Sequence, residues 1–190
     1  MARLIGLTGG IATGKSTVSD YLAGQYHWPV FDADIYARAA VLPGTTGLAA
    51  IIDRYGSELL LADQTLNRAK LGEIVFTYVN ERQWLESIVH PYVRQCFAAD
   101  LAKITDTAVA VIPLLFETNL QKMVSEVWVI TCSPQQQLDR LQTRNQLTLE
   151  QAQARIKSQM PLAAKVRLAN VVLDNSGTTS DLIEQIIANA

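Results

Sequence analysis

A glycine-rich segment placed between a short apolar run and a helical pattern constrains this chain most. Residues 9–17 read GGIATGKST and follow the apolar run 4–7 directly. A glycine, four further residues and then Gly-Lys-Ser match a phosphate-binding loop, in which backbone N–H groups wrap a polyphosphate. A helix at 15–26 would point its positive end at the same anion. The segment therefore predicts a nucleoside triphosphate ligand.

The side chains of this segment indicate separate roles. Lys15 has the reach for the β- and γ-phosphates, and the Ser16 hydroxyl is suited to bind Mg²⁺. The predicted nucleotide-binding residues are Gly10, Ile11, Ala12, Thr13, Gly14, Lys15, Ser16 and Thr17.

Composition limits the remaining possibilities. With 190 residues, 49% of them hydrophobic, the chain can bury the core of one domain. A net charge of −2 with scattered Lys and Arg residues argues against nucleic acid and anionic membranes as partners. Cys96 and Cys132 lack the spacing of a metal site, so we expect free thiols. Without a long apolar run or room for a signal peptide before the loop, we expect a cytoplasmic protein. The sequence leaves the oligomeric state open.

Alternating strand-like and helical patterns predict the fold class. The expected strands are 3–7, 29–31, 107–112, 126–131 and 170–173. Strands separated by helices imply a parallel sheet covered on both faces, hence an α/β three-layer fold.

Two stretches lack strand signals. Between residues 34 and 105 we expect successive helices, including 48–55, 68–77 and 80–103, with Pro91 kinking or dividing the last one near His90. Residues 133–168 are again helical and rich in charged and amide side chains, which suits a mobile cover. The first stretch reads as a helical insertion.

Acidic residues follow two of the expected strands. Asp32 and Asp34 come after the second strand, at the sheet edge where ligands bind. Either carboxylate could accept a proton from an attacking hydroxyl or hold a Mg²⁺-bound water, and Asp34 could instead cap a helix. Glu117 follows the buried run 108–116 and could contact an acceptor or a metal-bound water, or it could open a helix.

Basic residues elsewhere allow two interpretations each. His90 could contact a phosphate or be structural. Arg140 and Arg144 lie one helical turn apart on one face. For Arg144 we favour a role as a source of positive charge near a γ-phosphate over a position on a solvated helix face. Residues 174–177 form a turn whose backbone could line a base pocket.

Several segments together resemble one family. In this order and at these separations, LTGGIATGKST, FDADIYAR, NRAKLGEIVF, HPYVR, IPLLFET and VVLDNSG resemble dephospho-coenzyme A kinase over about residues 3–181. The resemblance implies transfer of the γ-phosphoryl group of ATP to the ribose 3′-hydroxyl of dephospho-coenzyme A, with Mg²⁺ required. It also implies a P-loop fold with a five-stranded parallel sheet.

The resemblance assigns parts of the chain and roles to residues. It implies a nucleotide-binding core (1–34, 104–137 and 166–190), a helical acceptor-binding subdomain (35–103) and a lid (138–165). Asp34 would be the base and Asp32 a supporting carboxylate. Lys15, Ser16 and the loop amides would hold Mg·ATP. The other implied residues are Arg144 in the lid, Asn175 and Gly177 beside adenine, and Thr8, His90, Leu115, Phe116 and Glu117 toward the acceptor.

One residue departs from the family pattern. The loop commonly reads GIGSGKS, whereas Ala12 stands here at the second of these glycines. A residue with a Cβ must avoid positive φ at this point or tolerate strain.

Three rival interpretations differ in testable features. Other small phosphoryl-transfer kinases would share the loop and carboxylate but not the acceptor. A GTP-dependent switch would need an Asn-Lys-x-Asp segment, which the sequence lacks. A non-catalytic nucleotide-binding module would not need both carboxylates.

Overall fold

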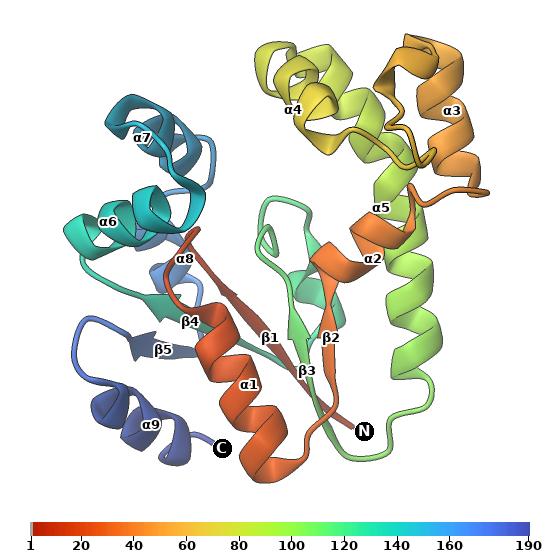
Figure 1. Cartoon of the computed structure of the whole chain (residues 1–190). Coiled ribbons are helices and arrows are strands. Elements are labelled where there is room, and N and C mark those ends of the chain that lie inside the picture. The colour runs from red at the N-terminus through yellow and green to blue at the C-terminus, as the bar shows by residue number, and fades with distance from the viewer. Residues whose placement is uncertain (1) are drawn as a thin grey trace. The chain divides into compact units, whose positions relative to one another are not determined.

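The chain divides into two compact units. A computed structural model describes residues 2–190, with Phe76 described in its backbone alone. The core unit comprises Met1–Asp32 and Ile104–Ala190, and the helical unit comprises Ala33–Lys103 (Figure 1). Among the described residues, no helix has both the length and the apolar character needed to cross a membrane.

The core unit is built on a parallel sheet of five strands in the order β2-β3-β1-β4-β5. This arrangement confirms the predicted α/β fold and the five strands, whose ends differ from the predicted ones by at most two residues. The strands are β1 (Arg3–Gly9), β2 (Val30–Asp32), β3 (Thr107–Val111), β4 (Glu126–Thr131) and β5 (Val171–Asp174).

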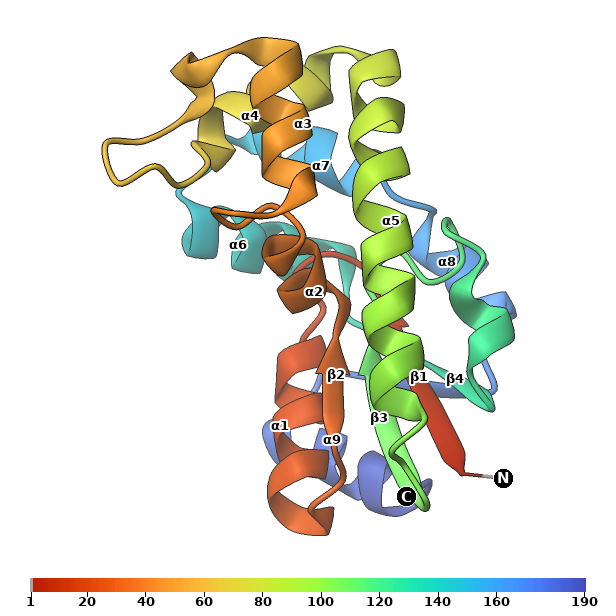
Figure 2. The same cartoon turned by 90° about the vertical axis from the view of Figure 1, so that its right-hand side faces the viewer.

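Helices cover both faces of this sheet. Figure 2 shows α1 and α9 side by side on one face and α8 on the other. The helices of the core unit are α1 (Lys15–Tyr26), α6 (Pro134–Asn145), α7 (Leu149–Lys157), α8 (Leu162–Arg167) and α9 (Thr179–Ile187), with a short 3₁₀ helix η2 (Leu120–Met123). The predicted layers are therefore present.

The register of the central strands positions the phosphate-binding loop. Leu7 in β1 pairs with Val111 in β3 and with Trp128 in β4, and all three side chains are buried. Asp32, at the end of β2, pairs with the same Val111. Because the strands are parallel, the Asp32 carboxylate and the loop that follows β1 lie at the same edge of the sheet.

The helical unit has its own apolar core. Its elements are α2 (Ala33–Ala39), α3 (Thr46–Tyr55), η1 (Ser57–Leu59), α4 (Arg68–Thr77) and α5 (Val79–Leu101). Their buried residues form one cluster around Leu48, Ile51 and Leu59. The α5 helix continues through Pro91, so of the two expectations for this proline, division is wrong, and a kink stays a prediction. Pro91 is exposed, and water can therefore hydrate the carbonyl group that its missing N–H leaves unbonded.

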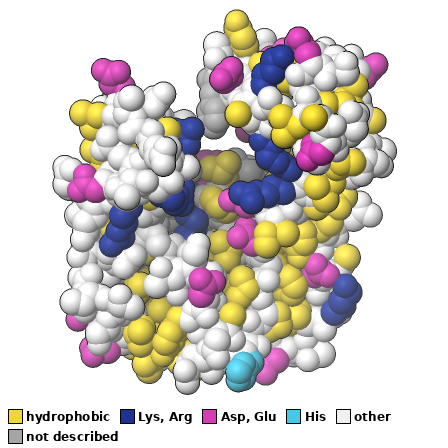
Figure 3. Space-filling view, in the orientation of Figure 1, with side chains coloured by type: hydrophobic (Ala, Val, Ile, Leu, Met, Phe, Trp, Pro, Cys, Tyr) yellow, Lys and Arg dark blue, Asp and Glu magenta, His cyan; other side chains and the backbone are white. Residues whose placement is uncertain are grey.

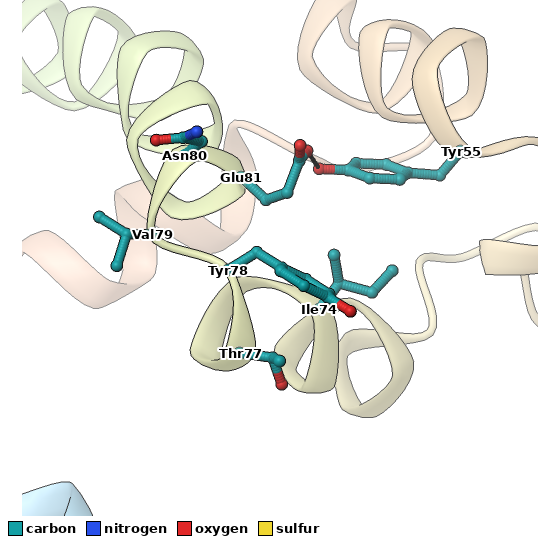
Figure 4. A pocket seen from close by; sticks show the side chains of 7 residues that line it. All are labelled: Tyr55, Ile74, Thr77, Tyr78, Val79, Asn80 and Glu81. Carbon is teal, nitrogen blue, oxygen red and sulfur yellow. Dashed lines mark hydrogen bonds between the residues drawn. The ribbon is translucent and has the colours of Figure 1, made fainter.

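A network of polar side chains joins α3 to α5. The Arg54 guanidinium donates to both carboxylate oxygens of Glu81, at 2.7 and 2.9 Å, and lies over the Trp84 ring at 4.6 Å. The Tyr55 hydroxyl donates to the same carboxylate beside a cavity of about 530 Å³ (Figure 4). Hydrogen bonds from Arg54 and Tyr55 lower the pKa of Glu81 from 4.5 to about 2.

This pKa shift predicts a pH dependence of stability. Since the folded chain lowers the pKa of Glu81, the contribution is present above pH 4.5 and is lost as the pH falls toward about 2. Glu81→Gln should lower the free energy of unfolding at pH 7 and flatten its decrease between these pH values. Urea unfolding at a series of pH values measures both effects. The exposed Glu73→Gln on α4 is the control, and an equal pH profile for Glu81→Gln and the unaltered protein would contradict the network.

Candidate active site

The loop between β1 and α1 follows the path of a phosphate-binding loop. Gly9 and Gly14 have positive φ angles of 154° and 105°. Ala12 also has a positive φ, 60°, in the left-handed region that favours glycine. The departure seen in the sequence is thus accommodated by strain at a positive φ, at a cost of about 1 kcal/mol.

The start of α1 is open to an anion. Gly14 is the N-cap residue, supplies no side-chain cap, and the first turn of α1 contains no acidic residue. The first N–H groups of a helix have no partner within the helix and carry its partial positive charge. This helix end therefore provides backbone donors for phosphate oxygens.

Two side chains of the loop segment form hydrogen bonds to the Gly10 carbonyl. Lys15 Nζ donates to it at 2.8 Å, and the Thr13 hydroxyl donates to it at 3.0 Å. Thr13 is fully buried, whereas Lys15 is partly exposed. The bond from Lys15 holds its ammonium group against the Gly10 carbonyl, and the bond from Thr13 closes the loop on the same oxygen.

The turn after β5 supports the loop from the side. Asn175 Nδ2 donates to the Thr13 carbonyl at 2.9 Å, and a Cβ at Gly14 would lie 2.1 Å from that amide nitrogen. Arg140 in α6 donates to the Asn175 carbonyl at 3.1 Å. The sequence indicates a role for the backbone of this turn, but it does not reveal that the Asn175 side chain holds the loop.

Lys165 is a functional candidate that the sequence does not reveal. It is fully buried in α8, and its ammonium group pairs with the Glu117 carboxylate at 2.9 Å. It also donates to the Pro113 carbonyl at 2.8 Å and to the Gly9 carbonyl at 3.5 Å. One charged group thus joins the end of β1, the exit of β3 and α8. Its sequence neighbourhood, LAAKVR, reads as an ordinary helix.

The predicted acceptor residues around β3 have structural contacts. The Thr8 hydroxyl donates to the Pro113 carbonyl at 3.2 Å. Leu115 is fully buried and Phe116 nearly so, which gives both side chains a packing role. Glu117 lies in a turn and accepts from the Met160 N–H at 3.0 Å in addition to Lys165. It does not open a helix, which was one of the two expectations for it.

The two predicted carboxylates lie at the junction of β2 and α2. Asp32 is the last residue of β2, and Asp34 is in the first turn of α2, which begins at Ala33. The alternative that Asp34 caps this helix is therefore wrong. A carboxylate in the first turn is nevertheless favoured by the helix dipole.

Asp34 and His90 line one pocket in the helical unit. Its volume is about 320 Å³, and its wall combines apolar side chains with charged ones. The lining residues are Asp34, Ala37, Arg38, Val41, Leu66, Arg68, Leu71, Gly72, Val75, Leu85, Glu86, Val89 and His90. The structure thus brings together a predicted base and a predicted acceptor residue.

Two arginines give this pocket its positive charge. Arg68 donates to the backbone carbonyl of Arg38 at 3.1 Å. Burial, and to a lesser extent the charge of Arg38, lowers the pKa of Arg68. Within the described part of the chain, neither guanidinium group forms an ion pair with a carboxylate. Two neighbouring guanidinium groups, of which that of Arg68 is partly desolvated, make a site for an anionic group.

The predicted lid arginine lies at the surface. Arg144 is in the last turn of α6, is exposed, and donates to the Asn145 side chain at 2.9 Å. Figure 3 shows Lys and Arg side chains gathered over the part of the core unit that contains α6 to α8.

Comparison with known proteins decides the family. Residues 3–181 match the family model described as dephospho-CoA kinase. The chain belongs to the dephospho-CoA kinase family. It is 57% identical to the dephospho-CoA kinase of Trichormus variabilis over 97% of this chain and 94% of that protein. It is 59% identical to the dephospho-CoA kinase of Synechocystis sp. over 97% of this chain and 93% of that protein.

Solved structures agree with this assignment. A Thermus thermophilus protein has a TM-score of 0.84 at 30% identity, covering 98% of this chain and 95% of that one. The dephospho-CoA kinase of Campylobacter jejuni has a TM-score of 0.73 at 28% identity, covering 99% and 95%. Shikimate kinase of Aquifex aeolicus, at 14% identity and a TM-score of 0.53, shares the fold. The predicted family, and with it a kinase that uses ATP as co-substrate, is confirmed.

The pair of the buried Lys165 and the partly exposed Glu117 yields a stability prediction. Lys165→Met should lower the free energy of unfolding by about 3 kcal/mol, since it leaves a half-buried carboxylate without its partner. Lys165→Met/Glu117→Gln should lose less than the sum of the single variants. Urea unfolding measures all three. Lys103→Met, which breaks an exposed pair with Asp100, is the control and should cost at most about 0.5 kcal/mol. Additive losses would show that the pair is not coupled.

Proposed function

We propose that this protein transfers the γ-phosphoryl group of ATP to the ribose 3′-hydroxyl of dephospho-coenzyme A, giving coenzyme A and ADP. The observation that carries this proposal is family membership over residues 3–181, which include the intact phosphate-binding loop. The reaction is the last step of coenzyme A biosynthesis.

ATP would bind at the loop between β1 and α1. Backbone N–H groups of the loop and of the first turn of α1 would hold the phosphates, and Lys15 would exchange its bond to the Gly10 carbonyl for one to a phosphate oxygen. Asn175 and Gly177 would lie on the adenine side. The uncapped, uncharged start of α1 supports this assignment.

The residues present fit a magnesium ion bound mainly by phosphate and water. The Ser16 side chain is exposed at the start of α1, and within the described part of the chain its hydroxyl forms no hydrogen bond. Mg²⁺ commonly uses one or two protein oxygens in such sites. Ser16 would hold the ion and Asp32 would support a bound water. The ion would neutralise charge on the β- and γ-phosphates.

Asp34 would act as the general base. Its carboxylate would take the proton of the acceptor 3′-hydroxyl as that oxygen bonds to the γ-phosphorus. The bond to the oxygen bridging the β- and γ-phosphates breaks, and ADP leaves with the electron pair. Arg144 would add positive charge as the lid (138–165) covers the site. This lid, the core and the acceptor-binding subdomain (35–103) stay predictions, as does a cytoplasmic location.

The pocket lined by Asp34 and His90 would receive the acceptor. Dephospho-coenzyme A carries a diphosphate group, which suits Arg38 and Arg68. The apolar side chains of the same wall would contact uncharged parts of the acceptor. His90, Leu115 and Phe116 stay predicted acceptor contacts, and the side chains of Leu115 and Phe116 are buried.

The first prediction of this proposal concerns turnover. The protein should release ADP from Mg·ATP only with dephospho-coenzyme A, and the product mass should increase by one phosphoryl group. Asp34→Asn should lower kcat at least about 100-fold with little change in the KM for ATP. Asp53→Asn, at an exposed position of α3, is the control. Release with another acceptor alone would favour a different small-molecule kinase, and near-normal turnover of Asp34→Asn would remove Asp34 as the base.

A second prediction concerns the acceptor pocket. Arg68→Met should raise the KM for dephospho-coenzyme A about tenfold and leave the KM for ATP nearly unchanged, because a charged hydrogen bond to the acceptor is lost. Steady-state kinetics with each substrate varied measures both constants. Arg94→Met, exposed on α5, controls for loss of one positive charge. Equal effects of the two variants would argue against the arginine site.

A further inference from the structure

Two glutamine side chains from outside the phosphate-binding loop hold the backbone of Ile11. The Ile11 N–H donates to Gln159 Oε1 at 2.9 Å, and Gln137 Nε2 donates to the Ile11 carbonyl at 2.9 Å. The N–H belongs to the peptide group between Gly10 and Ile11, and the carbonyl belongs to the next one. The two bonds therefore fix the orientation of both peptide groups at the crest of the loop.

Gln137 is fixed in place by burial. It lies in α6 and exposes only 6% of its surface. A Cβ at Gly10 would lie 2.4 Å from its amide nitrogen, so loop and side chain are in close contact. The amide group of Gln137 has little freedom to leave the Ile11 carbonyl without a local rearrangement of α6 or of the loop.

Gln159 is held through the connector between α7 and α8. The next residue, Met160, donates its N–H to Glu117 at 3.0 Å. Glu117 pairs in turn with the buried Lys165, whose ammonium group also lies 3.5 Å from the Gly9 carbonyl. The connector is thus tied to the start of the loop through Lys165 and to its crest through Gln159.

The left-handed conformation of Ala12 explains why such support is needed. With φ at 60°, Ala12 is in a region that a residue with a Cβ disfavours. Rotation of the peptide group between Ile11 and Ala12 would relieve this strain and turn the Ala12 N–H away from the phosphates. That rotation requires breaking the bond from Gln137, and movement of Ile11 would also break the bond to Gln159.

We propose that Gln137 and Gln159 are positioning residues for ATP: they clamp Ile11 so that the Ala12 N–H and the following loop donors face the β- and γ-phosphates. The inference rests on the proposed ATP site. In this proposal the α6 helix and the α7–α8 connector hold the loop backbone in its binding conformation, in addition to any positive charge that they supply.

The test replaces each glutamine by methionine, which keeps the length of the side chain and removes its amide. Gln159→Met should raise the KM for ATP and the Kd for ADP about fivefold, as expected for one lost hydrogen bond. The KM for dephospho-coenzyme A and the thermal midpoint should change little. Gln153→Met, at an exposed position of α7, is the matched control. An unchanged or lower KM for ATP, or an equal rise of both KM values, would overturn the proposal.

A double variant tests whether the two side chains act as one clamp. Because both bonds fix the same residue, Gln137→Met/Gln159→Met should raise the KM for ATP by less than the product of the single effects. Effects that multiply would indicate independent contacts and contradict the clamp. If the buried Gln137→Met does not fold, Gln159→Met still decides the question. Lys15→Ala distinguishes failure of the ATP site from failure of the clamp. If Lys15→Ala leaves activity intact, the proposed ATP site is wrong. If Lys15→Ala loses activity while Gln159→Met keeps a normal KM for ATP, only the clamp is wrong.

Discussion

A loop that binds phosphate through its own N–H groups cannot use those groups to hold its shape. The donors must point outward to the anion, so the shape has to be imposed by neighbouring groups. Here the neighbouring side chains form hydrogen bonds to carbonyl oxygens of the loop and to one N–H group, that of Ile11, which is not part of the start of α1. Asn175 binds the Thr13 carbonyl, two glutamines bind Ile11, and Lys165 lies against the Gly9 carbonyl. The core unit is organised around this requirement.

The buried ammonium group of Lys165 shows how far this organisation extends. Burying a charge is costly unless hydrogen bonds and an opposite charge compensate for it. Compensation comes from the Glu117 carboxylate and the Pro113 carbonyl. Pro113 lies two residues after the end of β3, and its carbonyl also accepts a hydrogen bond from the Thr8 hydroxyl near the end of β1. One side chain thus contacts the chain at the end of β1 and just after β3, next to the start of the loop.

The sequence predicts features that depend on local pattern, and it misses those that depend on burial. The strands, the α1 helix and the loop follow from apolar runs, glycines and their spacing. Gln137, Gln159 and Lys165 look like members of solvated helices, because no local signal marks a polar side chain that tertiary packing will enclose. The resemblance implies that Leu115 contacts the acceptor, and the sequence gives no sign that its side chain is fully buried. The identity of the acceptor came from family resemblance, since no spacing of residues encodes it.

Ala12 illustrates why a loop of this kind tolerates a disfavoured residue. Its cost of about 1 kcal/mol is small beside the several bonds that the surrounding side chains make to the loop, each worth about 1 kcal/mol. Those bonds hold the residues before and after Ala12, at Ile11 and Thr13. A backbone fixed on both sides leaves Ala12 no lower-energy conformation without breaking one of them. The strain at Ala12 is therefore tolerated because side chains around the loop, and Thr13 within it, hold the backbone on both sides. A glycine is not required where these bonds determine the path.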